Sequence, residues 1–205
     1  MVEHNKEIKN HTWILIAAYL EGPSIYSVIT DIKKKGYGNI IVVDDGSTDN
    51  TYAELQRTED VTVTKHIINR GKGAAVRTGM EIAKLRQARV VVTMDGDGQH
   101  NPENIDALVK KIVDENDVAL GTRAEDIANM PFIKRIANFL GNMFSTLLYG
   151  INVSDSQCGF RAYSEKAIRL IHTTTDRYGY DSEVLREIKR HKLSYTEVPV
   201  DAIYT

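Results

Sequence analysis

Short apolar runs rich in β-branched residues alternate with longer amphipathic stretches through the first two-thirds of the chain. This alternation predicts strand and helix repeats around a parallel sheet. The predicted strands are Trp13–Ala18, Ile40–Asp44, Val61–His66, Val90–Met94 and Val118–Gly121. The predicted helices are Ile25–Lys35, Thr48–Arg57, Gly73–Leu85 and Pro102–Glu115. The expected fold class is therefore α/β, with helices on both faces of a mostly parallel central sheet.

The simple alternation stops after Thr122. We expect a loop there, followed by an apolar segment and a polar turn at Ser154–Ser156. A last helix at Asp181–His191 is expected to lead to a final strand at Ser194–Val200.

Two of the predicted helices carry start signals. The side chain of Ser47 or Thr48 is expected to cap the helix at 48–57, and Asp49 complements the positive end of its dipole. Asn101 is expected to cap the helix at 102–115, which opens on Pro102.

The composition is that of one soluble globular domain, 1–205. A length of 205 residues suits a single hydrophobic core, and 42% hydrophobic with 26% charged residues excludes a disordered chain. A formal net charge of -2 lacks the basic field of a protein that grips nucleic acid, so we expect no nucleic-acid partner. The polar stretch 1–12 is expected to be a flexible tail.

Cysteine usage and the N-terminus bear on the compartment. The single cysteine, Cys158, cannot form an internal disulfide, and no apolar signal segment opens the chain. Both features favour a reducing, cytoplasmic location. No run reaches the ~18–20 apolar residues that a membrane span needs; the nearest approach, Ile136–Ile151, is interrupted by polar residues and glycines.

Polar residues follow three of the predicted strands, at Tyr19–Glu21, Asp44–Ser47 and Asp95–His100. In an open parallel sheet, ligands bind at the carboxyl ends of the strands. Asp95 and Asp97 are two residues apart, so on an extended segment both carboxylates face the same side and suit Mg²⁺ or Mn²⁺. A solvated turn is the alternative for these acids. An EF-hand calcium loop is excluded, because its sixth position is His100 instead of glycine.

Two further segments suggest a site for a nucleotide. One carboxylate of Asp44 and Asp45 suits a base edge or a ribose hydroxyl, while the other is placed to cap the next helix. The stretch 69–75 opens a helix with two glycines, Arg70 and Lys72, and the free amides of a helix start favour an anion. A plain helix start explains this second segment equally well.

Together these segments resemble family 2 glycosyltransferases of the GT-A fold, and in particular the dolichyl-phosphate mannose synthases and related polyprenyl-phosphate sugar transferases. The resemblance runs in order from Trp13 almost to the C-terminus. The matching segments are 18–21, 42–49, 69–73, 95–99, 121–123 and 156–161.

The resemblance implies a Rossmann-like sheet and assigns roles to individual residues. Those implied to bind the nucleotide sugar are Ala18, Tyr19, Glu21, Asp44, Asp45, Lys72, Asp95, Gly96, Gln99 and Arg161. Those implied to surround a Mg²⁺ or Mn²⁺ ion are Asp95, Asp97 and Gln99. Arg123 is implied to lie near the donor diphosphate, and Arg135 with Asn138 near the acceptor phosphate, although solvated surface positions remain open for the arginines.

The implied activity is metal-dependent, inverting transfer of a hexose from GDP-mannose or a UDP-sugar to a polyprenyl (dolichyl-type) phosphate. Asp97, Arg123 and Asp181 are the expected catalytic residues. A metal ion and Arg123 would absorb the charge that builds on the leaving diphosphate. A phosphate acceptor needs no general base, whereas a hydroxyl acceptor needs one, for which Asp181 and Glu183 are candidates. Helix capping and dipole pairing are the alternative roles of these two acids.

An apolar face at 131–151, with Lys134 and Arg135 at its start, suits a helix in a membrane interface, and a buried core helix is the alternative. With a lipid acceptor, the expected location is the cytoplasmic face of a membrane, as a peripheral protein. Two features depart from the family. Ala17 and Leu20 stand where relatives have Pro and Asn. The given sequence ends at Thr205, so the loop that closes over the donor in relatives either lies beyond this sequence or is not needed.

Two other functions remain open. One is a family 2 transferase with a saccharide or protein hydroxyl as acceptor. The other, suggested by the missing closing loop, is a catalytically silent module that binds nucleotide sugars.

Overall fold

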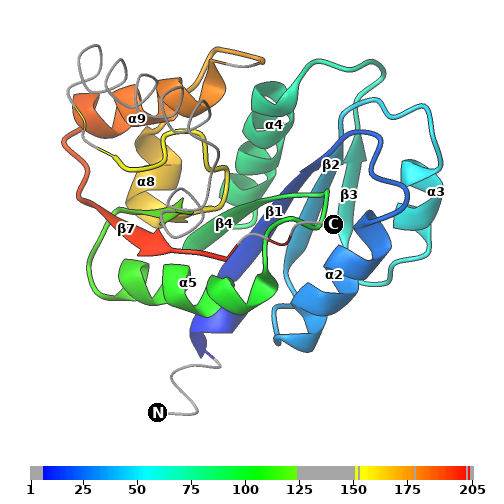
Figure 1. Ribbon diagram of the computed structural model, residues 1–205, viewed down its shortest axis with the longest axis horizontal. Helices are drawn as coiled ribbons and strands as arrows, with labels where there is room; N and C mark the ends of the chain where they lie inside the picture. Colours follow the sequence, from blue (N-terminus) through cyan, green and yellow to red (C-terminus); the bar gives the residue numbers. More distant parts are fainter. Residues whose placement is uncertain (1–6, 124–150, 152, 178, 202, 204–205) are drawn as a thin grey trace, which may run out of the picture.

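The computed structural model describes residues 7–123, 151, 153–177, 179–201 and 203. A seven-stranded sheet with the order β3-β2-β1-β4-β6-β5-β7 forms its centre (Figure 1). The strands are β1 Thr12–Ala18, β2 Ile40–Asp44, β3 Thr62–Lys65, β4 Val90–Asp95, β5 Val118–Thr122, β6 Arg161–Ser164 and β7 Tyr195–Pro199. All neighbouring strands run parallel except β6, which is antiparallel to both β4 and β5. The predicted mostly parallel α/β sheet is confirmed.

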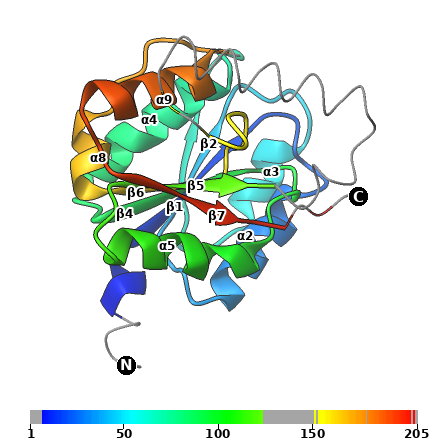
Figure 2. The ribbon, with the colours of Figure 1, turned by 60° about the vertical axis from the view of Figure 1, so that its left-hand side comes forward.

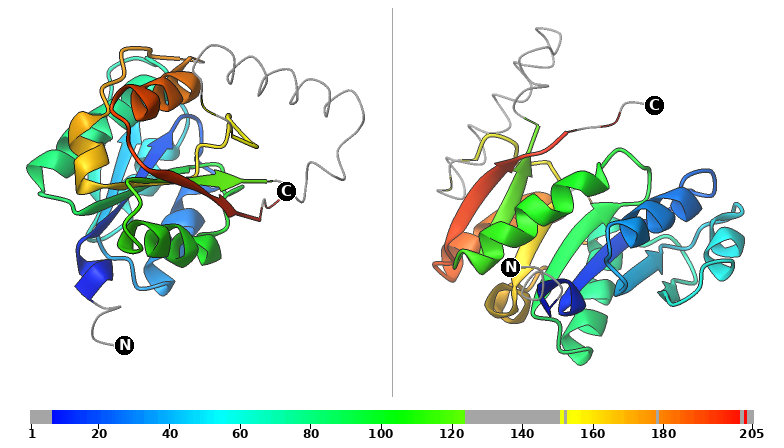
Figure 3. Two further views of the ribbon diagram at one scale, coloured as in Figure 1. Left: turned by 90° about the vertical axis from the view of Figure 1, so that its left-hand side faces the viewer. Right: turned by 90° about the horizontal axis from the view of Figure 1, so that it is seen from below.

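Helices cover both faces of this sheet, as Figure 2 shows with the sheet seen nearly edge-on. The helical elements are α2 Ile25–Lys34, α3 Thr51–Gln56, α4 Lys72–Leu85, the 3-10 turn η1 Pro102–Asn104, α5 Ile105–Val113, α8 Glu165–Leu170 and α9 Tyr180–Arg190. α2, α3 and α5 share one hydrophobic cluster, and α4, α8 and α9 share the other. The two views of Figure 3 show the same three layers.

The period-two pattern of β1 divides its side chains between the two clusters. Ile14 and Ile16 face the cluster that contains α2 and α5, whereas Leu15 faces α4. All three are 0% exposed, because a parallel strand covered on both faces has no solvent side. Gly79 makes room for this packing, since a Cβ there would collide with the Leu15 side chain. β1 is thus fixed at the centre of the sheet.

The sequence pattern did not predict β6 and α8. β6 opens on Arg161, and a charged residue argues against a strand in the middle of a sheet. The structure places that side chain at 1% exposure, where its guanidinium donates to the carbonyls of Ser156 and Cys158. α8 has only six residues, although Ser164 caps it by accepting the N–H of Ala167.

The cap predicted for the second helix is wrong. α3 begins only at Thr51, and neither Ser47 nor Thr48 caps it. The Ser47 hydroxyl instead accepts the N–H of Leu20, while an Asp49 carboxylate oxygen accepts the N–H of Thr51. The cap predicted at Asn101 is confirmed, because its side chain accepts the N–H of Glu103 ahead of α5. Ser47 therefore joins two loops, whereas Asp49 binds the first residue of α3.

Part of the polar stretch 1–12, which we expected to be a flexible tail, is packed against the domain. Residues 7–10 are helical, the Lys9 ammonium lies 3.0 Å from a carboxylate oxygen of Asp106, and Thr12 is 0% exposed. Most of the apolar segment at 131–151 lies outside the described residues. In the described parts of the chain, no helix has the length and apolar character needed to cross a membrane.

Glu183 anchors the start of α9. Its carboxylate accepts the backbone N–H groups of Thr174 and Thr175 at 2.9 and 2.8 Å and the Thr174 hydroxyl at 2.9 Å. Burial would raise the pKa of this carboxyl group, but the hydrogen bonds from Thr175 and Thr174 outweigh burial and lower it to about 2. The charged form of Glu183 therefore stabilises the fold.

We expect Glu183→Gln to lower the free energy of unfolding at pH 7 by about 2 kcal/mol. The folded pKa lies below the ordinary value of 4.5. The contribution of Glu183 is therefore complete above about pH 4.5 and declines as the pH falls towards about 2. Urea unfolding of the wild type and the variant at several pH values measures the difference. Glu81→Gln, at an exposed ion pair with Lys84, is the control. A difference that stays constant from pH 6 to pH 3 would contradict this assignment.

Candidate active site

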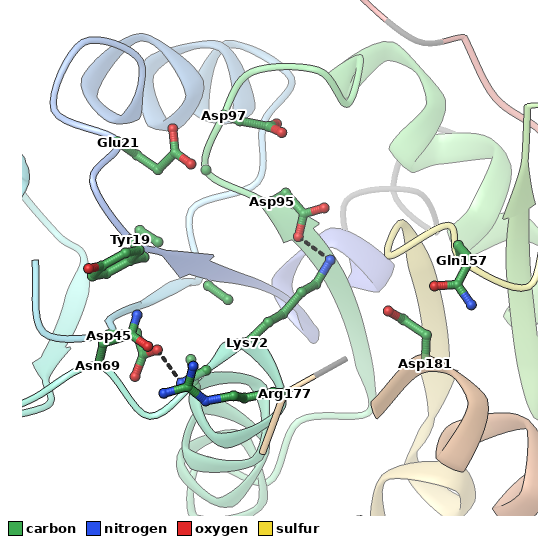
Figure 4. Close-up of a pocket in the computed structure, with 15 residues that line it drawn as sticks. Tyr19, Glu21, Asp45, Asn69, Lys72, Asp95, Asp97, Gln157, Arg177 and Asp181 are labelled. Atoms are coloured by element: carbon green, nitrogen blue, oxygen red, sulfur yellow. Dashed lines mark hydrogen bonds and ion pairs between the residues drawn. The ribbon is translucent and has the colours of Figure 1, made fainter. Parts of the chain in front are cut away.

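The loops that follow β1, β2 and β4 meet at one edge of the sheet and border a cavity of about 560 Å³ (Figure 4). The start of α4 and two later segments complete its wall. The lining residues are Ala17, Ala18, Tyr19, Glu21, Asp45, Asn69, Gly71, Lys72, Ala75, Asp95, Gly96, Asp97, Gln157, Arg177 and Asp181. The predicted strand-end residues thus come together in a single concave site.

Asp95 and Asp97 both line this cavity, as their spacing predicted. Asp95 is the last residue of β4, and Asp97 follows in the turn, where its carboxylate accepts the N–H of Gln99 at 2.9 Å. Gly96 lies between them against β1, and a Cβ there would come within 3.3 Å of Ala18. The two carboxylates therefore share one wall of the site with Glu21 (Figure 4).

Lys72, the first residue of α4, forms an ion pair with Asp95. Its ammonium lies 2.5 Å from an Asp95 carboxylate oxygen. Burial would lower the pKa of Lys72, but Asp95 and then Asp181 raise it above its ordinary value. Gly159 gives the ammonium its space, because a Cβ at this position would collide with it. The site therefore holds a fixed positive charge beside the carboxylates.

His100 supports Asp95 from behind. Its Nδ1 accepts the backbone N–H of Asp95 at 3.1 Å, and its ring stacks on Phe160 with centroids 4.9 Å apart. Burial lowers the pKa of His100, so the neutral ring prevails at pH 7, which leaves Nδ1 free to accept. Burial would raise the pKa of Asp95, but the ammonium of Lys72 lowers it below its ordinary value. Asp95 is therefore an anion held from two sides.

The surroundings of Glu21 shift its pKa upward, in the opposite direction to that of Asp95. Burial first, and then the nearby charges of Asp97 and Asp95, raise the pKa of its carboxyl group, although a hydrogen bond with Ser24 opposes them. Three acids near one another make this side of the cavity strongly negative. A bound cation or the hydroxyl donors of a sugar would relieve that repulsion.

Asp44 and Asp45 have different roles. Asp44 is 0% exposed, accepts the N–H of Ser47 and pairs with Lys65, and it does not line the cavity. The local role that the sequence left open thus fits Asp44. Asp45 does line the cavity, and its two oxygens accept the backbone N–H groups of Arg70 and Gly71 at 3.0 and 2.6 Å. Asp45 therefore shapes the loop beside the cavity.

Arg161 and Asp181 act as a pair. Arg161 does not line the cavity; its guanidinium holds the 156–158 turn and lies 3.1 Å from an Asp181 carboxylate oxygen. Asp181 and Gln157 do line it. The resemblance implied that Arg161 binds the donor, but in the structure it positions the segments that reach the cavity. Glu183, the other candidate base, is engaged by Thr174 and Thr175 and does not line it either.

Four predicted site residues lie elsewhere or outside the described part. The side chain of Gln99 is exposed and is not a lining residue. Arg123 makes a two-point ion pair with Asp155, at 2.7 and 3.1 Å, and does not line the cavity. Arg135 and Asn138 fall within 124–150, outside the described residues.

Several lining residues carried no predicted role. Asn69 and Gly71 belong to the helix-start motif that suggested an anion site, and Gln157 belongs to a segment of the family resemblance. The sequence therefore carried a signal for all three residues. Arg177 had no signal, because it comes from the segment before α9 that packs on the start of α4. That packing needs Gly71 and Gly73, where a Cβ would collide with the backbone oxygens of Asp176 and Thr175.

The donor set suits a hard divalent cation that shares its coordination with a ligand. Asp95 and Asp97 supply carboxylate oxygens on one wall, and Lys72 already neutralises part of the Asp95 charge. Among the described residues, no three His, Cys, Asp or Glu side chains gather closely enough to hold a metal ion. Mg²⁺ sites are commonly built from one or two carboxylates together with water and substrate phosphates.

Comparison with known proteins identifies the family of the chain. The family model Glycosyl transferase family 2 matches residues 13–171. An uncharacterised protein of Methanocaldococcus jannaschii is 40% identical, with 100% of this chain and 88% of the relative covered. The UDP-N-acetylglucosamine–dolichyl-phosphate N-acetylglucosaminyltransferase of Methanococcus voltae is 35% identical over 94% of this chain and 86% of the relative. The polyprenol monophosphomannose synthase of Mycolicibacterium smegmatis is 32% identical, with 79% of this chain and 65% of the relative covered.

A solved structure shares the fold. Glucosyl-3-phosphoglycerate synthase from Mycobacterium tuberculosis, in complex with Mn²⁺ and UDP-glucose, superimposes with a TM-score of 0.74 at 18% identity, covering 100% of this chain and 75% of that one. This neighbour supports the expected GT-A fold. The matched family model spans the loops after β1, β2 and β4 and the start of α4 that border the cavity. The name of one relative specifies dolichyl phosphate, and the name of another specifies polyprenol monophosphomannose. The chain is a glycosyltransferase and belongs to glycosyltransferase family 2.

Proposed function

We propose that this glycosyltransferase moves a hexose from a nucleoside diphosphate sugar to a polyprenyl phosphate, with inversion at the anomeric carbon and with the help of Mg²⁺ or Mn²⁺. The observation that carries the proposal is the cavity at the carboxyl ends of the strands, where Asp97 and the ion pair of Asp95 with Lys72 line one site beside the start of a helix. The acceptor class comes from the names of the relatives, two of which specify dolichyl phosphate or polyprenol.

The nucleoside would lie on the side of the cavity formed by Tyr19, Asp45 and Asn69. Tyr19 offers an aromatic face, and Asn69 offers amide donors and an acceptor for a base or ribose edge. The carboxylate of Asp45 already accepts two backbone N–H groups, and one of its oxygens lies 2.6 Å from Nδ1 of His66. We therefore assign Asp45 to shaping this part of the pocket, with the direct contacts left mainly to its neighbours.

The diphosphate would lie between the start of α4 and the acidic wall. The positive end of a helix dipole favours anions, and the Lys72 ammonium adds a full charge at the start of α4. The Ala74 N–H there already donates to the Asp176 carbonyl. Asp97 and Asp95 would hold the divalent ion, which as a Lewis acid would stabilise charge on the leaving diphosphate. Lys72 is oriented by Asp95 before any ligand binds, so its contribution to this electrostatic stabilisation needs little rearrangement.

A polyprenyl phosphate would attack through an oxygen that is already anionic, so the transfer needs no general base. Asp181 lines the cavity and would be the base if the acceptor were a hydroxyl, which is the second candidate function. Its ion pair with Arg161 points to a positioning role. Arg123 and the predicted acceptor residues Arg135 and Asn138 stay proposals for the phosphate side. A lipid acceptor would place the protein at the cytoplasmic face of a membrane.

We expect Asp97→Asn to weaken cation-assisted nucleotide binding at least tenfold, because it removes a carboxylate that would share the ion with the diphosphate. Thermal shifts with UDP and GDP, each with and without Mn²⁺, measure it, since a ligand of the native state raises the apparent stability. Asp31→Asn, at an exposed ion pair on α2, is the control. If the double variant Asp95→Asn with Asp97→Asn bound nucleotide and Mn²⁺ like the wild type, the proposed site would be wrong.

Asp181→Asn separates the two acceptor classes. With polyprenyl phosphate we expect the variant to keep kcat within about tenfold of the wild type, because no proton has to be removed. A hydroxyl acceptor would lose about 10²–10⁴ in kcat on removal of its base. Transfer from radiolabelled UDP- and GDP-sugars to dolichyl phosphate is the assay, and circular dichroism checks that the variant stays folded. Transfer by the wild type to a saccharide hydroxyl but not to dolichyl phosphate, lost in the folded variant, would favour the hydroxyl acceptor.

A further inference from the structure

Two adjacent isoleucines project from the loop between β3 and α4 into solvent. Ile67 is 99% exposed and Ile68 is 68% exposed. Burying an aliphatic side chain of this size is worth about 1.5–3 kcal/mol, so the exposure of two neighbours is costly unless something covers them. Neither residue lines the donor cavity, although the next residue, Asn69, does. The function proposed above does not use this pair.

The loop is held in this conformation by its neighbours. Asp45 binds the backbone beyond the isoleucines at Arg70 and Gly71, and it binds the ring of His66 before them. The other ring nitrogen of His66 lies 3.0 Å from the Thr78 hydroxyl oxygen. The backbone of Ile68 packs so closely on Gly46 that a Cβ there would collide with it. The isoleucines are therefore presented outward by a clamped loop.

More apolar side chains lie at the same edge of the sheet. Tyr19 and Leu20 after β1 are each 43% exposed, and Tyr52 at the start of α3 is 38% exposed. We call Tyr19, Leu20, Tyr52, Ile67 and Ile68 the rim surface. The Ser47 hydroxyl accepts the N–H of Leu20, and Lys65 donates to the Ser47 carbonyl and lies over the Tyr52 ring, so the loops of the rim surface are connected. Figure 1 shows these loops together at one end of the sheet.

The chemistry of this edge suits an anionic lipid surface. Lys65 and Arg70 flank the isoleucines in sequence and are both exposed. The Lys65 ammonium also lies 3.5 Å from a carboxylate oxygen of the buried Asp44, so Arg70 contributes the larger share of positive charge. Asp49, an exposed acid on the loop after β2, keeps its negative charge and accepts the N–H groups of Gly22 and Thr51. Aliphatic tips, tyrosines and flanking cations are the combination that binds the interface of a bilayer. Tyr19 belongs to both the rim surface and the donor cavity, so contact here would bring the cavity to the membrane.

We propose that the rim surface docks on an anionic bilayer through Ile67 and Ile68, so that the donor cavity opens beside the lipid that carries the acceptor phosphate. This inference rests on the proposed polyprenyl-phosphate acceptor for its purpose. The contact itself rests on the exposure, the clamp and the flanking cations. The two parts can be tested separately.

The binding test is sedimentation of the protein with phosphatidylglycerol vesicles. We expect the double variant Ile67→Ser with Ile68→Ser to bind at least fivefold more weakly than the wild type. Leu85→Ser is the matched control, because Leu85 is 84% exposed but lies at the far end of α4. We expect the control to bind like the wild type. Wild-type binding should also weaken at about 0.5 M salt, where charge attraction is screened.

Transfer to a short-chain, water-soluble polyprenyl phosphate separates this inference from the proposed function. We expect the double variant to use the soluble acceptor at the wild-type rate and to lose at least fivefold with acceptor embedded in vesicles. If the wild type transferred sugar to neither acceptor, the proposed function would be overturned. The docking proposal would then be judged by vesicle binding alone.

Equal vesicle binding by the wild type and the double variant would overturn the docking proposal, as would absence of vesicle binding by the wild type. Light scattering tests the remaining occupant, a second copy of the chain. A wild-type dimer that the double variant converts to a monomer, with vesicle binding unchanged, would assign the isoleucines to self-association and would also overturn the proposal.

Discussion

The ion pair between Lys72 and Asp95 joins the end of β4 to the start of α4, and much of the cavity is arranged around it. Because both partners are partly withdrawn from water, each stabilises the charged form of the other. Around the pair, Gly159 leaves the space that the ammonium occupies, and the neutral ring of His100 holds the Asp95 backbone. A cation at the helix start and an anion at the strand end are thereby fixed a few ångströms apart. The proposed donor carries both a diphosphate and a sugar rich in hydroxyl groups, and this pair of charges would suit both parts.

A second group of contacts brings distant parts of the chain to the same site. Arg161, buried in β6, binds the turn before it and the Asp181 side chain, and both Asp181 and Gln157 reach the cavity. Glu183 holds the segment just ahead of α9, from which Arg177 extends towards the cavity (Figure 4). Burying these charges is tolerable only because each is matched by several hydrogen bonds. Side chains that do not line the cavity, Arg161 and Glu183, therefore position the residues that do.

The sequence allowed most of the sheet and half of the site to be predicted. Hydrophobic periodicity located six of the seven strands, and the rule that ligands bind at the carboxyl ends of parallel strands brought out Asp45, Asp95 and Asp97. Prediction from the sequence failed where tertiary contacts override the local pattern. β6 begins with an arginine whose partners are 3–20 residues away, and Arg177 enters the site only through backbone packing against glycines. Gln99 follows the acidic motif, yet its side chain turns to solvent, because sequence spacing does not fix side-chain direction in a turn.

The antiparallel strand β6 has a mechanical consequence. Within the sheet, β5 and β7 are attached to β4 only through this strand of four residues, which pairs with β4 from Val90–Ser164 to Thr93–Arg161. Alternate residues of a strand face opposite sides, so a slip of one residue along this ladder would turn Arg161 away from Asp181 and towards α5. The position of Asp181 in the cavity wall therefore depends on the register of one four-residue strand, β6, against β4.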